Sequence, residues 1–139
     1  MEIHINFWAV LLGAVASMVI GAIFYADGVF GKEWKKLGKI DMKQFEKKMA
    51  ANMAQVFVYA LITSYAVAFV ACLYRGYHHS SWISAGVVSA LVLFVGVSAT
   101  TVTIHNTLNQ IPKKLTSITL SNRFLSILAM GLIIGWLHP

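Results

Sequence analysis

The segment INFWAVLLGAVASMVIGAIFYA, residues 5–26, carries no charged side chain. A helix that crosses a bilayer needs about 20 predominantly apolar residues, so this segment is long enough to span. Its apolar run exceeds the roughly 7–15 residues typical of a secretory signal, and Glu2 and His4 precede it instead of Lys or Arg. We therefore expect a helix that stays in the protein. Further apolar stretches cover residues 49–74, 82–104 and 116–137.

The composition supports the same fold class along the whole chain. The 139 residues are 58% hydrophobic and 12% charged, with a mean hydropathy of +0.72. Soluble domains carry about 25% charged residues, and a small domain buries only about two-thirds of the surface of its unfolded chain. The excess apolar surface must face lipid. The sequence predicts an all-α integral membrane four-helix bundle, with residues 1–139 forming a single transmembrane domain, and excludes Rossmann and barrel folds.

The distribution of Lys and Arg predicts the orientation of the bundle in the membrane. Two connections on the same side of the predicted bundle hold Lys32, Lys35, Lys36, Lys39, Lys43, Lys47, Lys48, Lys113 and Lys114. The opposite side offers Arg75. Because cytoplasmic loops are enriched in Lys and Arg, we expect both termini outside and the protein in a bacterial cytoplasmic membrane. The net charge of +6 also predicts attraction to anionic lipid headgroups. Nothing in the sequence resembles a nucleic-acid-binding module.

The connection between the first two spans, residues 27–50, has a helical pattern of its own. Phe30, Trp34 and Leu37 fall at i, i+4 and i+7, with lysines between them. This pattern predicts a short amphipathic helix in the membrane interface, with Trp34 facing the acyl boundary. Asp41 and Gln44 predict an N-cap and capping box for a second short helix. The segment is either a connector that sets the splay of the spans, or a surface for lipid or a cytoplasmic partner. That surface comprises Phe30, Lys32, Trp34, Lys35 and Lys36.

Several short motifs resemble those of a known family. They are NFWAV at residues 6–10, Phe24-Tyr25, FGKEW at 30–34, Met130-Gly131 and the closing Trp136. With them the chain resembles, over nearly its whole length, the small bacterial membrane proteins of domain-of-unknown-function family 1761. Members often carry Ser-Pro where this chain has Ala26-Asp27, so the local turn is expected to differ. The resemblance implies a four-span fold and no established activity, and no catalytic residue is carried over.

Small residues recur at four-residue spacing on two of the predicted spans. They are Gly13, Ser17 and Gly21 on the first span, and Gly131 and Gly135 on the fourth. Such faces let helix backbones approach closely in lipid. They can serve packing within one chain or a seam between chains. Because four short helices bury little surface among themselves, a homo-oligomer is a reasonable expectation.

Polar side chains enter three spans at their lysine-rich ends, and Arg123 stands out among them. An arginine well inside a span costs at least about 2.5–3.5 kcal/mol on insertion scales unless it is paired or reaches the surface. Asp27 is the one carboxylate expected near its level. We consider two hypotheses, a structural clasp and a polar vestibule that binds an anionic or polar small molecule. The vestibule would comprise Asp27, Asn52, Gln55, Tyr59, His105, Asn106 and Arg123.

Other chemistry is less well supported by the sequence. His4, His78, His79 and His138 fall on the predicted outer side and are suitable ligands for zinc, copper or nickel, although their spacing matches no known motif. No carboxylate lies in the middle of a predicted span, and no span contains an internal proline, which argues against proton-coupled export through broken helices. No catalytic constellation can be assembled, so we expect neither an enzyme nor a cofactor.

The sequence thus favours a small polytopic membrane protein that acts as a structural or interaction module and forms a homo-oligomer. The alternative is a small channel or transporter with a cytoplasm-facing polar vestibule around Arg123. Metal binding by the outer histidines is a lesser alternative.

Overall fold

The computed structural model describes residues 2–138 and is built from helices. Four helical stretches are long and apolar enough to cross a membrane: Phe7–Phe24, Met49–His78, Trp82–Leu108 and Lys113–Leu137. No strand occurs within these described residues. The prediction of an all-α membrane bundle with four spans is confirmed.

The helical elements follow one another with short connections. They are α1 (Phe7–Phe24), α2 (Gly31–Leu37), α3 (Met42–Lys47), α4 (Met49–His78), α5 (Trp82–Leu93), the π-helical η1 (Phe94–Ala99), α6 (Thr100–Leu108) and α7 (Lys113–Leu137). The third span, formed by α5, η1 and α6, continues past the predicted end at residue 104. The fourth span begins three residues before the predicted start. Both differences arise because a helix satisfies its own backbone hydrogen bonds, so polar threonines at the end of a span do not terminate it.

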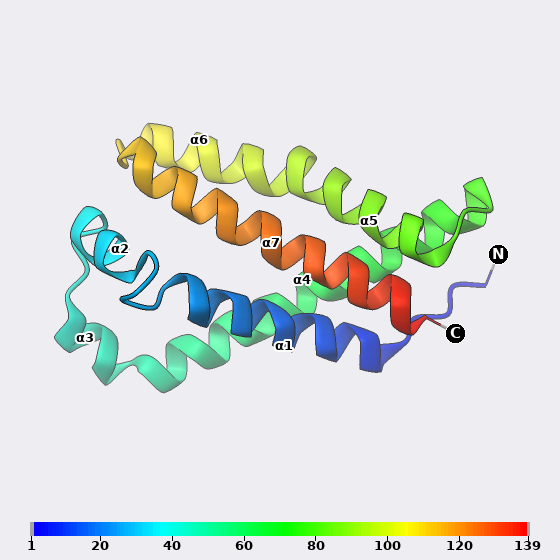
Figure 1. Cartoon of the computed structure of the whole chain (residues 1–139), viewed down its shortest axis with the longest axis horizontal. Coiled ribbons are helices and arrows are strands. Elements are labelled where there is room, and N and C mark those ends of the chain that lie inside the picture. Colours follow the sequence, from blue (N-terminus) through cyan, green and yellow to red (C-terminus); the bar gives the residue numbers. More distant parts are fainter. Residues whose placement is uncertain (1, 139) are drawn as a thin grey trace.

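Helix α7 is the centre of the bundle. It packs against α5, α1 and α4, and Figure 1 shows it running between α1 and the α5–α6 span. The beginning of α1 and the end of α7 lie at the same end of the bundle. There Asn6 caps α1 by accepting hydrogen bonds from the amides of Trp8 and Ala9, while its Nδ2 donates to the carbonyl of Leu137 at 2.8 Å. The opposite end, named here the lysine-rich end, carries α2, α3 and the turn between α6 and α7 (Figure 1).

Glycines form the seam between α5 and α7. The backbones of Gly86 and Gly131 approach so closely that a Cβ on either would overlap the other's carbonyl oxygen. A Cβ on Gly135 would lie 2.7 Å from the Cα of Ile83. Gly131 and Gly135, which the sequence marks for helix packing, therefore contact α5 of their own chain. Their partner Gly86 is not part of the predicted pattern.

Helix α4 belongs to the bundle along only part of its length. Its buried residues begin at Ala60 and continue to Cys72. The preceding segment, Met49–Tyr59, contains no buried residue, and Figure 1 shows it diverging from α7 toward α3. The helices come together where Gly13 of α1 meets Ser64 of α4 and Met130 of α7. Below that contact, toward the lysine-rich end, they enclose a cavity.

Candidate functional site

The principal candidate site is a cavity of about 600 Å³ between α1, α4 and α7, named here the central cavity. The contact of Gly13 with Ser64 and Met130 closes it toward the middle of the bundle. Residues of α2 and α3 line it at the lysine-rich end. Val56 and Tyr59, which line its α4 wall, are 48% and 57% exposed, so the cavity is open at the side along α4.

Arg123 lines the central cavity from α7. It makes no hydrogen bond and no ion pair with any of residues 2–138. Beside it in sequence, Asn122 also lines the cavity, and its buried Oδ1 has no partner among the described residues. Across the cavity, the hydroxyl of Tyr59 accepts a hydrogen bond from Gln55 Nε2 at 3.3 Å. The cavity therefore has a polar wall with hydrogen-bonding capacity to spare.

The rest of the lining is mainly apolar and rich in methionine. Every methionine in the described part of the chain contributes to it: Met18, Met42, Met49, Met53 and Met130. Methionine is flexible and polarizable, so it fits ligands of variable shape and is frequent at adaptable binding surfaces. No Asp or Glu lies in the lining, whereas Arg123 and Lys35 both do. Because Lys35 is paired with Asp27, the unpaired positive charge of this apolar cavity comes from Arg123.

Helix α2 forms part of the cavity wall. The Trp34 ring packs against Tyr25 at 5.1 Å and Phe45 at 5.5 Å between ring centroids, and it lines the central cavity. Phe30 packs against Phe24 at 5.0 Å. The prediction of a short helix in this connection is confirmed, but the predicted direction of Trp34 is wrong, because the chain turns back after α1 and directs the aromatic face inward. Lys32 and Lys36 remain exposed.

The turn that reverses the chain explains why Asp27 is not the partner of Arg123. Gly31 donates its amide to the Ala26 carbonyl at 2.9 Å, and a Cβ at Gly31 would overlap the backbone of Tyr25 and Ala26. The reversal brings Lys35 to Asp27, and the two form an ion pair at 2.8 Å. This hydrogen bond and the charge of Lys35 lower the pKa of Asp27 below its ordinary value.

A second ion pair connects α2 with α7. Lys114 Nζ lies 3.1 Å from Glu33 Oε1. Both side chains are well exposed, so the pair contributes little to stability on its own. Together with the aromatic contacts of Trp34, it holds α2 over the lysine-rich end of the central cavity.

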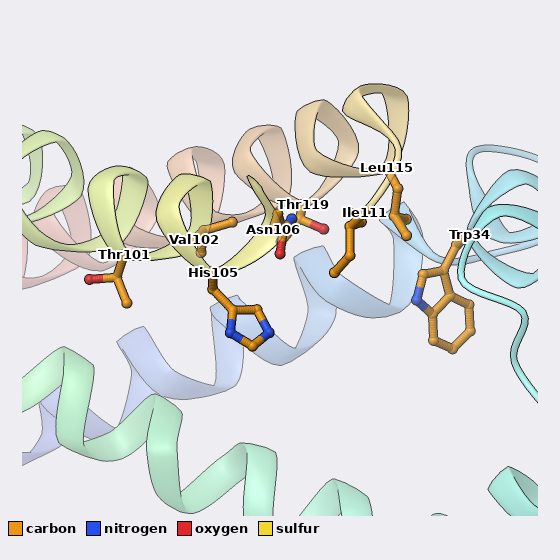
Figure 2. A pocket seen from close by; sticks show the side chains of 8 residues that line it. All are labelled: Trp34, Thr101, Val102, His105, Asn106, Ile111, Leu115 and Thr119. Atoms are coloured by element: carbon orange, nitrogen blue, oxygen red, sulfur yellow. The ribbon is translucent and has the colours of Figure 1, made fainter. Parts of the chain in front are cut away.

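His105 and Asn106 line a different space, a pocket of about 260 Å³ between α2, α6 and α7. Figure 2 shows the His105 ring projecting from α6, with Thr101 at one end of the pocket and the Trp34 ring at the other. Asn106 is buried and donates from Nδ2 to Thr116 Oγ1 at 3.0 Å. Trp34 and Thr119 line both this pocket and the central cavity, so they form the shared wall.

The predicted vestibule residues are thus divided among several places. Arg123 and Tyr59 share the central cavity, and Gln55 reaches it through its bond to Tyr59. Asn52 lies on α4 outside the lining. Asp27 lies at the surface with Lys35. The prediction that these side chains form one continuous cluster is wrong, because α4 diverges from α6 and leaves the helices too far apart to bring their polar faces together.

The small residues of α1 also have two different placements. Gly13 contacts Ser64 and Met130, as expected for a packing position. Ser17 and Gly21 line the central cavity instead. A Cβ placed on Gly21 would have no neighbour within 4 Å. The absence of a side chain at Gly21 therefore leaves space in the cavity and does not serve a helix contact.

The four histidines proposed for metal binding do not come together. His138 Nε2 donates to the His4 carbonyl at 2.8 Å, and the His138 ring stacks on Trp82. His78 packs against Tyr74, and His79 ends α4 in a left-handed conformation. In the part of the chain that the structure describes, no three His, Cys, Asp or Glu residues are arranged to hold a metal ion.

The helices and the central cavity define a class of protein, a small α-helical membrane protein with four spans. Residues 8–135 match the family described as protein of unknown function (DUF1761), and the chain belongs to that family. The resemblance found in the sequence motifs is thereby confirmed. No curated protein and no solved structure matches the chain.

Proposed function

We propose that this protein binds an anionic small molecule in the central cavity and serves as a small membrane carrier for it. The single observation that carries the proposal is Arg123, a cation that lines a cavity of about 600 Å³ and has no carboxylate partner in residues 2–138. Ligand sites commonly have volumes of about 300–1,000 Å³ and a few polar groups in an apolar wall. The central cavity fits that description.

The depth of Arg123 supports a ligand over a purely structural role. At 1.5 Å per residue, Arg123 lies about 15 Å along α7 from Lys113 and about 20 Å from Trp136, which places it inside the span. An unpaired arginine at such a depth is costly, and residues of this kind usually face a cavity or a substrate pathway. A bound anion would offset this cost.

The orientation of the carrier follows from the lysines. We place the lysine-rich end in the cytoplasm and both termini outside, in a bacterial cytoplasmic membrane, because cytoplasmic loops are rich in Lys and Arg. In this orientation the central cavity is accessible from the cytoplasmic half of the membrane. Exposed Lys32 and Lys36 are then available to anionic headgroups.

The homo-oligomer is a second proposal with a separate observation in its favour. Thr101, Thr103 and His105 of α6 are exposed although they belong to a membrane-capable span. Polar side chains at membrane depth tend to find hydrogen-bond partners on another helix. A second copy of the chain would supply such a helix.

The two arginines of the chain provide a test with an internal control. We expect Arg123→Gln to retain the unfolding temperature of the native protein but lose small anions that co-purify with it in mild detergent, as measured by mass spectrometry of the extract. Arg75→Gln is the matched control, because Arg75 lies outside the lining and stacks over Trp82 at 4.2 Å. If Arg123→Gln unfolds the protein and the native chain carries no anion, Arg123 is a structural clasp and the proposal is wrong.

A further inference from the structure

We infer that the ligand of the central cavity is an acidic single-chain amphiphile, such as a fatty acid, with its anionic group at Arg123 and its chain along the methionine wall. This inference rests on the proposed function and names the ligand class. It is argued from the size, the lining and the opening of the cavity.

The size of the cavity favours one hydrocarbon chain. Taking about 30 Å³ per heavy atom, which is the share of one water molecule in the liquid, 600 Å³ holds about 20 heavy atoms. A long-chain fatty acid has that number. A diacyl phospholipid of the surrounding bilayer has more than twice as many, so the cavity does not hold it whole.

The lining of the cavity requires both an apolar and an anionic part in the ligand. A small hydrophilic anion would leave the partly exposed side chains of Met18 and Met53 facing water. A purely apolar ligand would leave Arg123 without a counter-charge. A soft metal ion, which methionine thioethers can also bind, is disfavoured by the positive charge of Arg123. An acid with a long alkyl chain satisfies both walls.

The opening of the cavity faces the place from which such a ligand would come. The unpacked segment Met49–Tyr59 of α4 borders the cavity on one side, and its Met49, Met53 and Val56 are partly exposed. The main packing partners of α6 are α7 and η1, so α6 does not cover this side. In a membrane this opening faces acyl chains, from which an amphiphile can enter sideways without crossing water.

The experiment is photolabelling of the full chain in vesicles of zwitterionic phospholipid, using a palmitate analogue with a mid-chain diazirine. We expect labelling of peptides that contain Met18, Met53 or Met130, and competition by excess palmitate. Hexadecanol, which has the chain without the charge, should compete at least about tenfold less well. Labelling spread evenly over outward-facing residues of all four spans would overturn the inference, because it is the pattern of annular lipid.

Three variants test whether the labelling takes place in the central cavity. Gly21→Phe should abolish cavity labelling, because its side chain would enter the space that the glycine leaves open. Gly96→Phe is its matched control, since Gly96 also has no neighbour within 4 Å but lies in η1, outside the lining, and should label like the native chain. Arg123→Gln should lower labelling by palmitate at least about tenfold, since charge-assisted hydrogen bonds contribute differences of this size. Equal labelling of the native chain and Gly21→Phe contradicts the inference.

Water-soluble anions separate failure of this inference from failure of the proposed function. If butyrate or inorganic phosphate competes at Arg123 as effectively as palmitate, the cavity binds anions but the assigned ligand class is wrong. If neither palmitate nor any of these anions binds in an Arg123-dependent way, the proposed function fails together with the inference.

Discussion

Substitution of Gly135 by alanine tests the close contact between α5 and α7. In the structure, the added Cβ would lie 2.7 Å from the Cα of Ile83 and 2.7 Å from the carbonyl oxygen of Trp82. Both neighbours are backbone atoms, so neither can rotate away. The two helices must separate locally by about 0.7 Å, the difference between 2.7 Å and the shortest ordinary contact of 3.4 Å.

The magnitude follows from the contacts that this separation weakens. A gap of about 0.5–1 Å removes a quarter to a half of the dispersion energy of each atom pair. Overpacking of this kind typically costs about 1–3 kcal/mol. Alanine recovers up to about 1 kcal/mol through its better helix propensity. We expect Gly135→Ala to lower the free energy of unfolding by about 1–2 kcal/mol.

The assay is reversible unfolding in mild detergent by titration with a denaturing detergent, followed by circular dichroism. Gly21→Ala is the matched control, because a Cβ at Gly21 meets nothing within 4 Å. It should be as stable as the native chain or more stable by up to about 1 kcal/mol. If Gly135→Ala proves as stable as Gly21→Ala, the close α5–α7 seam is not a feature of the folded protein.

Three further predictions concern other parts of the chain. Asn6→Ala removes the cap of α1 and the hydrogen bond to the Leu137 carbonyl. It should lower the free energy of unfolding by about 1–2 kcal/mol in the same titration. An unchanged free energy of unfolding would contradict the contact between Asn6 and Leu137. The ion pair with Lys35 lowers the folded-state pKa of Asp27, so its stabilisation is present above the ordinary value of 3.8 and is lost as the pH falls through the folded value. The native chain should therefore be more stable than Asp27→Asn at neutral pH, and the two free energies of unfolding should converge below about pH 3.8. A difference in free energy that does not change with pH would argue against the Asp27–Lys35 ion pair. Lys39→Cys, in a chain whose native cysteine is replaced by alanine, should resist membrane-impermeant thiol reagents in intact cells, and labelling would reverse the proposed orientation.

The spans were predictable because each signal is local. An apolar run of sufficient length must form a helix in lipid, where every backbone polar group needs an internal partner. The short helix after α1 was also predictable from the spacing of Phe30, Trp34 and Leu37. Asp41 caps α3 as its sequence indicates, by accepting from the amides of Lys43 and Gln44.

The site was less predictable because it depends on how the helices are placed relative to one another. Arg123 and Tyr59 were marked by their chemistry, and both line the central cavity. The sequence pattern does not reveal that α4 diverges from α6, and this divergence separates His105 from them. Two further sequence features belong to this cavity: the polar Asn122 beside Arg123, and Met53, one helical turn after Met49.

The inward direction of the Trp34 side chain shows a second limit of prediction from sequence. An amphipathic pattern predicts that one face of a short helix is apolar, but not whether that face meets lipid or protein. The answer depends on Gly31, whose missing side chain permits the tight reversal after α1. A glycine in a connection is by itself too common a signal to predict such a turn.

Native mass spectrometry of the protein released from mild detergent tests the central claim most directly. The native chain and Gly96→Phe should each carry one additional mass per chain, corresponding to an acidic single-chain amphiphile, whereas Gly21→Phe should appear without it. A native chain that carries no such mass, or a Gly21→Phe variant that retains it, would contradict the account of the central cavity as a binding site.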